Sequence, residues 1–179
     1  MSLPILTLLG CYALEDVPIF AGVHCDLPRE ATVVRVLDGD TLQLDSCEGE
    51  TVRLLGVSAP EVVHDVADAC IPEPGGGEGE RDDCFGPEAR SAMADLLVGQ
   101  TVRLEFDATC ADRYGRTLAY VYLPGAGAGG SDLFVNQWVI LKGYARVYED
   151  FDDILQRDVL YTAQYAAEAA SAGLWGTCE

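Results

Sequence analysis

Five short segments rich in β-branched and apolar residues limit the folds that are open to this chain. They alternate apolar and polar positions, which is typical of strands with one buried face, and they cover residues 32–37, 41–44, 51–57, 101–106 and 117–122. Only the turn Asp38-Gly39-Asp40 separates the first two, which predicts a hairpin in which Gly39 takes a positive φ. Together with the helical segments between and after them, these strands predict a small α+β domain, mainly β, built as a partly closed barrel.

The stretch between the third and fourth expected strands has the features of a helix. Pro87 stands in its first turn and Glu88 near the positive end of the helix dipole, and Gly99 follows as a stop. The helix is therefore expected to occupy residues 89–98. The residues expected to face inward are Ala92, Leu96 and Leu97.

Two further helices are expected after the last strand. Asp132 is interpreted as the N-cap of a helix that ends at Leu141, and another helix is expected from Asp152 or Asp153 to about Ala172. The side chains expected to lie along one side of the first of these helices are Phe134, Trp138 and Leu141. Trp138 and Trp175 are interpreted as core residues.

The chain is strongly acidic, with 30 acidic residues against 11 basic ones and a net charge of −19. This excludes the class of nucleic-acid-binding protein that relies on a broad basic surface. Residues 61–88 carry nine acids against Arg81 alone, whereas residues 89–148 carry five acids and six bases. An anionic substrate must therefore be bound locally, by a few oriented arginine side chains or by a metal ion.

Seven cysteines are many for a chain that works in a reducing compartment. Near the start, a short apolar stretch ends in Leu8-Leu9-Gly10-Cys11, which resembles a bacterial lipoprotein signal with Cys11 as the lipidated residue. We therefore expect a leader and tether over residues 1–28, a folded domain over residues 29–179, and export as a secreted, periplasmic or membrane-anchored protein. The alternative is an ordinary start segment with one spare thiol.

Six cysteines then remain for three disulfides, and the sequence alone leaves fifteen pairings open. Proximity favours Cys70–Cys84, which would close a glycine-rich loop. The other two pairs would then be Cys25–Cys47 and Cys110–Cys178. No Cys-x-x-Cys motif occurs, so a zinc site has little support.

Six motifs, in order along the chain, resemble those of the staphylococcal nuclease (thermonuclease-like) family. They are Val36-Leu-Asp-Gly-Asp-Thr41, Arg53-Leu-Leu-Gly-Val-Ser-Ala-Pro-Glu61, Gly86-Pro-Glu-Ala89, Asp112-Arg-Tyr-Gly-Arg-Thr-Leu-Ala-Tyr120, Val135-Asn136 and Gly143-Tyr-Ala145. The resemblance extends from about Thr32 to Trp175. It implies an OB-fold, which is a five-stranded barrel with three helices.

The same resemblance implies a Ca²⁺-dependent phosphodiesterase that acts on DNA and RNA, breaks the bond to the 5′ oxygen and leaves 3′-phosphate ends. Its catalytic residues would be Arg53, Glu61 and Arg116. This set suits the chemistry, because two guanidinium groups can bind the oxygens on which charge develops, and a carboxylate can orient or deprotonate the attacking water. Tyr114 and Arg113 would lie beside the nucleotide.

The implied metal site departs from the family pattern at one position. Its ligands would be Asp40, the side chain at position 58 and the backbone carbonyl of Ala59, but Ser58 stands where the family has an aspartate. Losing a charged ligand predicts weaker Ca²⁺ binding or recruitment of a substitute acid. The substitutes considered are Asp38 and Asp65.

Three interpretations of function follow. The first is an exported nuclease acting on DNA and RNA, preferentially single-stranded, with no protein partner. The second, favoured by Ser58, is a non-catalytic nuclease-like module that binds nucleic acid or protein, and the third is a disulfide-linked surface lipoprotein with a scaffold role. Residues considered as further lining of a cleft are Lys142, Arg146 and Tyr148, while His64 is interpreted as a solvated loop residue.

Overall fold

The computed structural model describes residues 29–45, 51–63, 82–114, 116–150 and 153–178. The expected leader over residues 1–28 with its lipidation site Cys11, the pair Cys25–Cys47, and both His64 and Asp65 lie outside the described residues.

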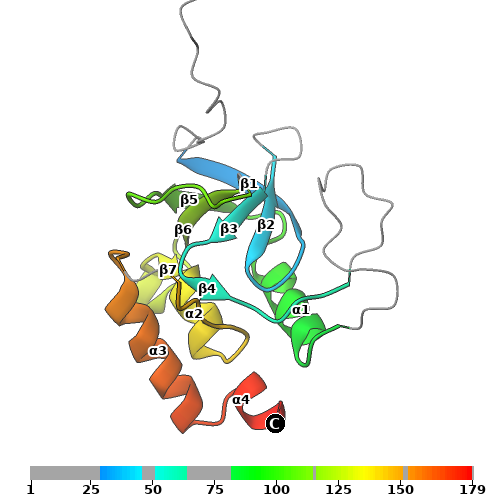
Figure 1. Ribbon diagram of the computed structural model, residues 1–179. Coiled ribbons are helices and arrows are strands. Elements are labelled where there is room, and N and C mark those ends of the chain that lie inside the picture. The colour runs from blue at the N-terminus through cyan, green and yellow to red at the C-terminus, as the bar shows by residue number, and fades with distance from the viewer. Residues whose placement is uncertain (1–28, 46–50, 64–81, 115, 151–152, 179) are drawn as a thin grey trace, which may run out of the picture.

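Five strands close into a barrel, as predicted (Figure 1). β1 (Glu30–Val36) pairs antiparallel with β2 (Thr41–Leu44) and β5 (Thr101–Glu105), and β2 pairs antiparallel with β3 (Thr51–Leu54). β5 pairs antiparallel with β6 (Thr117–Leu123), and a parallel pairing of β3 with β6 closes the ring. The fold class is confirmed as α+β, mainly β, with an OB-type barrel and three main helices that lie below it in Figure 1.

Alternation along the strands fills the barrel with aliphatic side chains. Val33, Leu42, Val52, Leu104 and Leu118 have no exposed surface. Each such side chain contributes about 1.5–3 kcal/mol relative to an exposed one. Neighbouring strand residues point to opposite faces of a sheet. Arg53, which lies between the core residues Val52 and Leu54, therefore points outward, and it carries the guanidinium group of the candidate site.

The third expected strand is two strands, because the chain bends at Gly56. Gly56 has a φ of +77°, and a Cβ atom there would lie 2.6 Å from Cδ1 of both Ile154 and Leu160. After the bend, β4 (Val57–Ser58) pairs antiparallel with β8 (Arg146–Val147). The expectation of one strand over residues 51–57 is therefore wrong beyond Leu54, and the bend brings the segment after Ser58 beside the Asp38–Asp40 turn.

Helix α1 (Gly86–Leu97) lies where it was expected and begins with the predicted proline turn. Its buried face consists of Ala89, Met93 and Leu97, which follow one another at four-residue spacing. The expected inner face is right at Leu97 only, because the helical period places Ala92 and Leu96 at the sides, where they are half-buried.

The segment expected to open a helix at Asp132 instead adds a strand to the sheet. After the short helical turn η1 (Ala128–Gly130), β7 (Leu133–Phe134) pairs with the end of β6, so α2 (Val135–Leu141) begins three residues after Asp132 and has no side-chain cap. The strand edge offers backbone hydrogen bonds that a capped helix would forgo. The buried residues of α2 are Val135, Asn136, Val139 and Ile140, whereas Phe134 and Trp138 are half-buried and Leu141 is exposed.

The last helix is shorter than expected. α3 spans Arg157–Ala169 rather than residues 152 or 153 to 172, and a four-residue helix, α4 (Leu174–Thr177), follows it. Trp175 in α4 is half-buried rather than fully in the core. None of the helices in the described part of the chain has the length and apolar character needed to cross a membrane.

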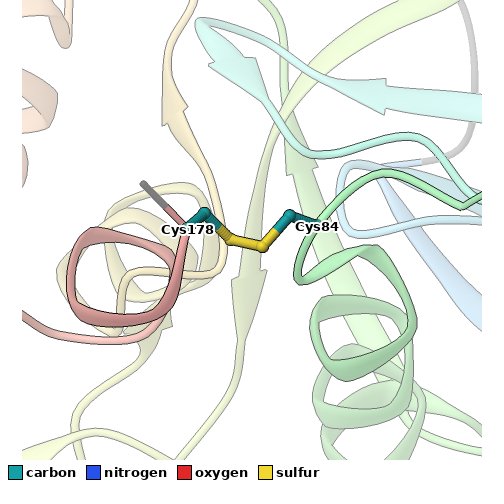
Figure 2. Close-up of a disulfide and its surroundings, with 2 residues drawn as sticks. All are labelled: Cys84 and Cys178. Carbon is teal, nitrogen blue, oxygen red and sulfur yellow. A yellow bond between two sulfur atoms is a disulfide. The ribbon is translucent and has the colours of Figure 1, made fainter.

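A disulfide joins Cys84, just before α1, to Cys178, just after α4 (Figure 2). The expected pairs Cys70–Cys84 and Cys110–Cys178 are therefore wrong, because the fold brings together two cysteines that are 94 residues apart in sequence. Cys110 is also disulfide-bonded. Proximity in sequence is a poor guide here, since the C-terminal turn returns to the start of α1.

Removal of this disulfide is expected to destabilise the domain substantially. The double variant Cys84→Ala/Cys178→Ala should lower the free energy of unfolding by about 2–5 kcal/mol, because the bond restricts the unfolded chain across a long loop. Urea denaturation of the oxidised wild-type protein and the variant measures the difference. A loss below about 1 kcal/mol would show that α4 holds the C-terminus without the bond.

Candidate active site

The buried carboxylate of Asp40 connects three parts of the site. Its Oδ1 accepts hydrogen bonds from Nη1 of Arg53 at 2.8 Å and from Oγ1 of Thr41 at 2.9 Å. Its Oδ2 accepts a hydrogen bond from the backbone N–H of Ala59 at 2.7 Å. The carboxylate is 1% exposed, so these bonds replace its hydration, and they hold the hairpin, β3 and the segment after β4 together.

The turn that carries Asp40 differs from the expected one in the backbone conformation of Gly39. Gly39 does not have a positive φ. It is required because a Cβ atom there would lie 2.7 Å from Cβ of Ala59 and 3.0 Å from Cβ of Ala89. Its missing side chain therefore lets the turn contact both the segment after β4 and α1.

Asp38 is a second buried acid beside Asp40. It is 7% exposed, and its Oδ1 accepts a hydrogen bond from the backbone N–H of Asp40 at 2.9 Å. Burial and the negative charge of Asp38 raise the pKa of Asp40 well above its usual value, while the positive charge of Arg53 and the hydrogen bond from Ala59 oppose this. The turn thus concentrates negative charge that one guanidinium only partly offsets.

Arg53 leaves β3 opposite Thr41 of β2, on the outward face of the barrel wall. Its side chain is 12% exposed and its guanidinium carbon lies 6.0 Å from the ring centre of Tyr148. In the described part of the chain, its ion pair with Asp40 uses Nη1. The remaining N–H groups of the fork can bind an anion that reaches this face.

Glu61 lies within electrostatic reach of both candidate arginines. Burial of its carboxyl group and the negative charge of Asp38 raise its pKa above the usual value, while the positive charges of Arg53 and Arg116 oppose the rise. Such effects require the charged groups to be near one another. The positive charges of Arg53 and Arg116 thus both act on the Glu61 carboxyl group, although the three residues come from separate segments of the chain.

Asp112 holds the backbone and side chain of Arg116. Asp112 Oδ1 accepts hydrogen bonds from the backbone N–H groups of Tyr114 and Arg116, each at 2.9 Å, and Oδ2 accepts one from Nε of Arg116 at 2.7 Å. Burial alone would raise the pKa of Asp112, but the hydrogen bonds and charge of Arg116 outweigh it and lower the pKa below its usual value. Arg116 is thus oriented through Nε, and its two Nη groups form no ion pair with a described residue.

Tyr114 and Arg113 form an exposed rim beside Arg116. Tyr114 is 68% exposed, and its hydroxyl accepts a hydrogen bond from Nη2 of Arg113 at 2.8 Å. The guanidinium carbons of Arg113 and Arg116 lie 4.8 Å and 5.5 Å from its ring centre. The arrangement offers a flat aromatic surface flanked by positive charge, which is suited to a nucleotide base and phosphate.

Ser58 and Ala59 line a pocket next to the site. The pocket has a volume of about 310 Å³, and its walls are Ser58, Ala59, Pro60, Asp83, Cys84, Arg146, Leu174 and Cys178. Arg146 pairs with Ser58 across β4 and β8, and its guanidinium carbon lies 4.8 Å from the ring centre of Trp175. Lys142 is exposed at the end of α2 and is not among the pocket's lining residues.

The donors around Asp40 suit a hard cation, and they fall short of a complete cage. Asp38 and Asp40 are buried carboxylates, and the hydroxyl of Ser58 and the carbonyl of Ala59 belong to the adjoining segment. Oxygen donors of this kind are those that Ca²⁺ prefers. Within the described ranges, no three His, Cys, Asp or Glu side chains cluster as a metal site.

Sequence reasoning missed Asp83, which contacts Glu61 directly. Asp83 Oδ2 accepts a hydrogen bond from the backbone N–H of Glu61 at 3.1 Å. The residue stands in the acid-rich stretch of residues 61–88. The only signal for it is its place just before the Gly86-Pro87 helix start.

Comparisons with known proteins agree with this geometry. A family model described as staphylococcal nuclease homologue matches residues 51–177. A thermonuclease of Staphylococcus intermedius is 32% identical over 177 residues, which cover 98% of this chain and 93% of that protein. An uncharacterized endonuclease of Escherichia coli O157:H7 is 32% identical over 82% of this chain and 77% of that protein, and a micrococcal nuclease of Shigella flexneri is 32% identical over 80% and 71%.

A match over most of the chain, on a closed barrel of the expected strand order, identifies this chain as a member of the staphylococcal nuclease family.

Proposed function

We propose that this protein is a Ca²⁺-dependent nuclease that hydrolyses phosphodiester bonds of DNA and RNA and leaves 3′-phosphate ends. The observation that carries the proposal is that Asp40 and Asp112 each orient one of the two candidate arginines, through Nη1 of Arg53 and Nε of Arg116. Both arginines also act electrostatically on Glu61. Membership of a nuclease family supports the class of substrate.

In the proposed reaction the two arginines bind the scissile phosphate. Negative charge grows on its non-bridging oxygens as water attacks, and preoriented guanidinium groups stabilise that charge best when it is greatest. Asp40 orients Arg53 through Nη1, and Asp112 orients Arg116 through Nε. Each arginine is thus oriented before the substrate binds, so little side-chain conformational entropy is lost when it contacts the phosphate.

Glu61 is the proposed general base. It accepts a proton from the attacking water as the new P–O bond forms and the bond from phosphorus to the 5′ oxygen breaks. The 5′ oxygen leaves as a hydroxyl group after taking a proton from solvent. The phosphate then remains on the 3′ side.

The proposed Ca²⁺ ligands are Asp40, the hydroxyl of Ser58 and the carbonyl of Ala59, with Asp38 as the substitute acid. Asp38 is the acid that the fold places beside Asp40. When bound, the ion would add positive charge next to the phosphate and polarise it. The missing carboxylate at position 58 predicts weaker binding than a site with an aspartate there.

The rim formed by Tyr114 and Arg113 supports a preference for single-stranded substrates. An exposed tyrosine ring can stack on an unpaired base, which is sequence-tolerant because every base has a π-face. Tyr114 and Arg113 are therefore the proposed substrate-binding residues outside the catalytic set.

We also propose that the protein is exported. The Cys84–Cys178 disulfide and the bonded state of Cys110 support an oxidising compartment. Attachment to a membrane through a lipidated Cys11 is part of the same proposal. It is supported by the lipoprotein-like pattern of residues 8–11.

The second candidate function is a non-catalytic module that binds nucleic acid or protein. Ser58 favours it, since loss of one metal ligand is a direct route to loss of catalysis. The nuclease predicts cleavage of DNA in the presence of Ca²⁺, whereas the module predicts binding of DNA without cleavage.

Removal of the proposed base or of one arginine should abolish most of the cleavage. Glu61→Gln should lower kcat about 10²- to 10⁴-fold and Arg116→Ala about 10²- to 10³-fold on denatured DNA with Ca²⁺, and chelation of the metal should stop cleavage by the wild-type protein. Glu88→Gln and Arg90→Ala on α1 are matched controls, and they should retain wild-type rates. Stable binding of DNA without cleavage in several divalent cations would favour the module instead.

Restoring the acid at position 58 should strengthen metal binding. Ser58→Asp should bind Ca²⁺ at least about tenfold more tightly, because affinity rises with the number of charged ligands. Isothermal titration calorimetry of wild-type protein and variant measures this, and Ser91→Asp on the exposed side of α1 controls for the added charge. Equal affinities in wild type and Ser58→Asp would show that position 58 is not part of the metal site.

A further inference from the structure

We propose that Asp83 is a positioning residue that fixes Glu61 for hydrolysis. The inference rests on the proposed function, because it assigns Asp83 a role only through the general base. Asp83 itself contacts the backbone of Glu61.

Asp83 and Glu61 exchange two hydrogen bonds. The backbone N–H of Glu61 donates to Oδ2 of Asp83 at 3.1 Å, and the backbone N–H of Asp83 donates to the carbonyl of Glu61 at 2.9 Å. Both backbone polar groups of Glu61 are therefore bound by one residue. Two residues further on, the N–H of Val63 donates to Oδ1 of Asp82 at 2.8 Å, which continues the contact between the two segments.

The start of α1 packs against the same backbone. The N–H of Gly86 donates to the carbonyl of Asp83 at 3.0 Å. A Cβ atom at Gly86 would lie 2.7 Å from the carbonyl oxygen of Glu61 and 3.3 Å from that of Pro60. Glycine at this position thus permits a close approach that any side chain would prevent.

The residues that follow Asp83 are themselves held in place. Cys84 is linked by the disulfide to Cys178 (Figure 2). Phe85 has a positive φ of 72°, and its ring stacks on Tyr144 with the ring centres 5.8 Å apart. The Asp83 carboxylate is therefore presented to Glu61 from a segment anchored to the C-terminal helix and to the start of α1.

This arrangement explains how an exposed residue can act as an oriented base. Glu61 is exposed as a residue and follows Pro60 in a segment without regular structure after β4. Its side chain can face Arg53 and Arg116 reproducibly only if its backbone is fixed. Loss of the Asp83 side chain would remove the hydrogen bond to the Glu61 N–H and loosen that backbone, and a displacement of about 1 Å can cost on the order of 100-fold in rate.

The test combines Asp83 with Glu61 in a double-mutant cycle. Asp83→Ala should lower kcat about 10- to 100-fold with KM changed less than about threefold, because phosphate binding by the arginines is retained. Asp83→Asn should restore most of kcat, since its amide oxygen can accept the same hydrogen bond. In a Glu61→Gln background, Asp83→Ala should lower the residual rate by less than about twofold.

Asp95→Ala is the matched control, since Asp95 is an exposed aspartate on α1, and it should leave kcat and KM unchanged. If Asp83→Ala does not fold by circular dichroism, Asp83→Ser serves in its place, because it keeps a polar side chain at this exposed position and removes the carboxylate that binds the Glu61 N–H.

Two results would overturn the inference: an equal loss of kcat from the Asp83 variant in both backgrounds, or an active Asp83 variant beside an inactive Glu61→Gln. Full activity of Glu61→Gln would instead refute the proposed function.

Discussion

The hydrogen bonds of one buried carboxylate, Asp40, determine how the parts of the site meet. It binds Arg53 on β3 and the backbone of Ala59 after β4, and it belongs to the turn between β1 and β2. A carboxylate with almost no exposed surface is costly to bury unless each oxygen is bonded. Because both oxygens of Asp40 are hydrogen-bonded, these segments are held close together. The same bonds position Arg53 and the segment that carries Glu61.

The remaining side chains are oriented by turns rather than by regular elements. The bend at Gly56 directs the chain from the barrel wall toward the turn that holds Asp40. Asp112 closes a second turn around the backbone and Nε of Arg116. Asp83 fixes the third segment, which carries Glu61. In each case the barrel holds the ends of the segment, and a hydrogen bond to an aspartate side chain positions the segment that carries the functional residue.

Local patterns predicted the barrel and α1, because alternation and proline placement act within a few residues. They failed at Asp132, where the open edge of β6 recruits the following residues as a strand before α2 can begin. They also failed at the Cys84–Cys178 pair and at Asp83, since both depend on segments that meet only in the folded chain. The departure from the family motif at Ser58 could be predicted from the sequence, but the burial of Asp38 beside Asp40 could not.

In the proposed reaction, two guanidinium groups and one carboxylate act on a single phosphate. A crystal structure with Ca²⁺ and a dinucleotide whose scissile 5′ oxygen is replaced by a methylene group tests it directly. We predict nitrogens of Arg53 and Arg116 within about 3 Å of oxygens of the same phosphonate, with Glu61 on the side opposite the leaving group. A phosphonate bound by only one of these arginines, or away from Glu61, would contradict it.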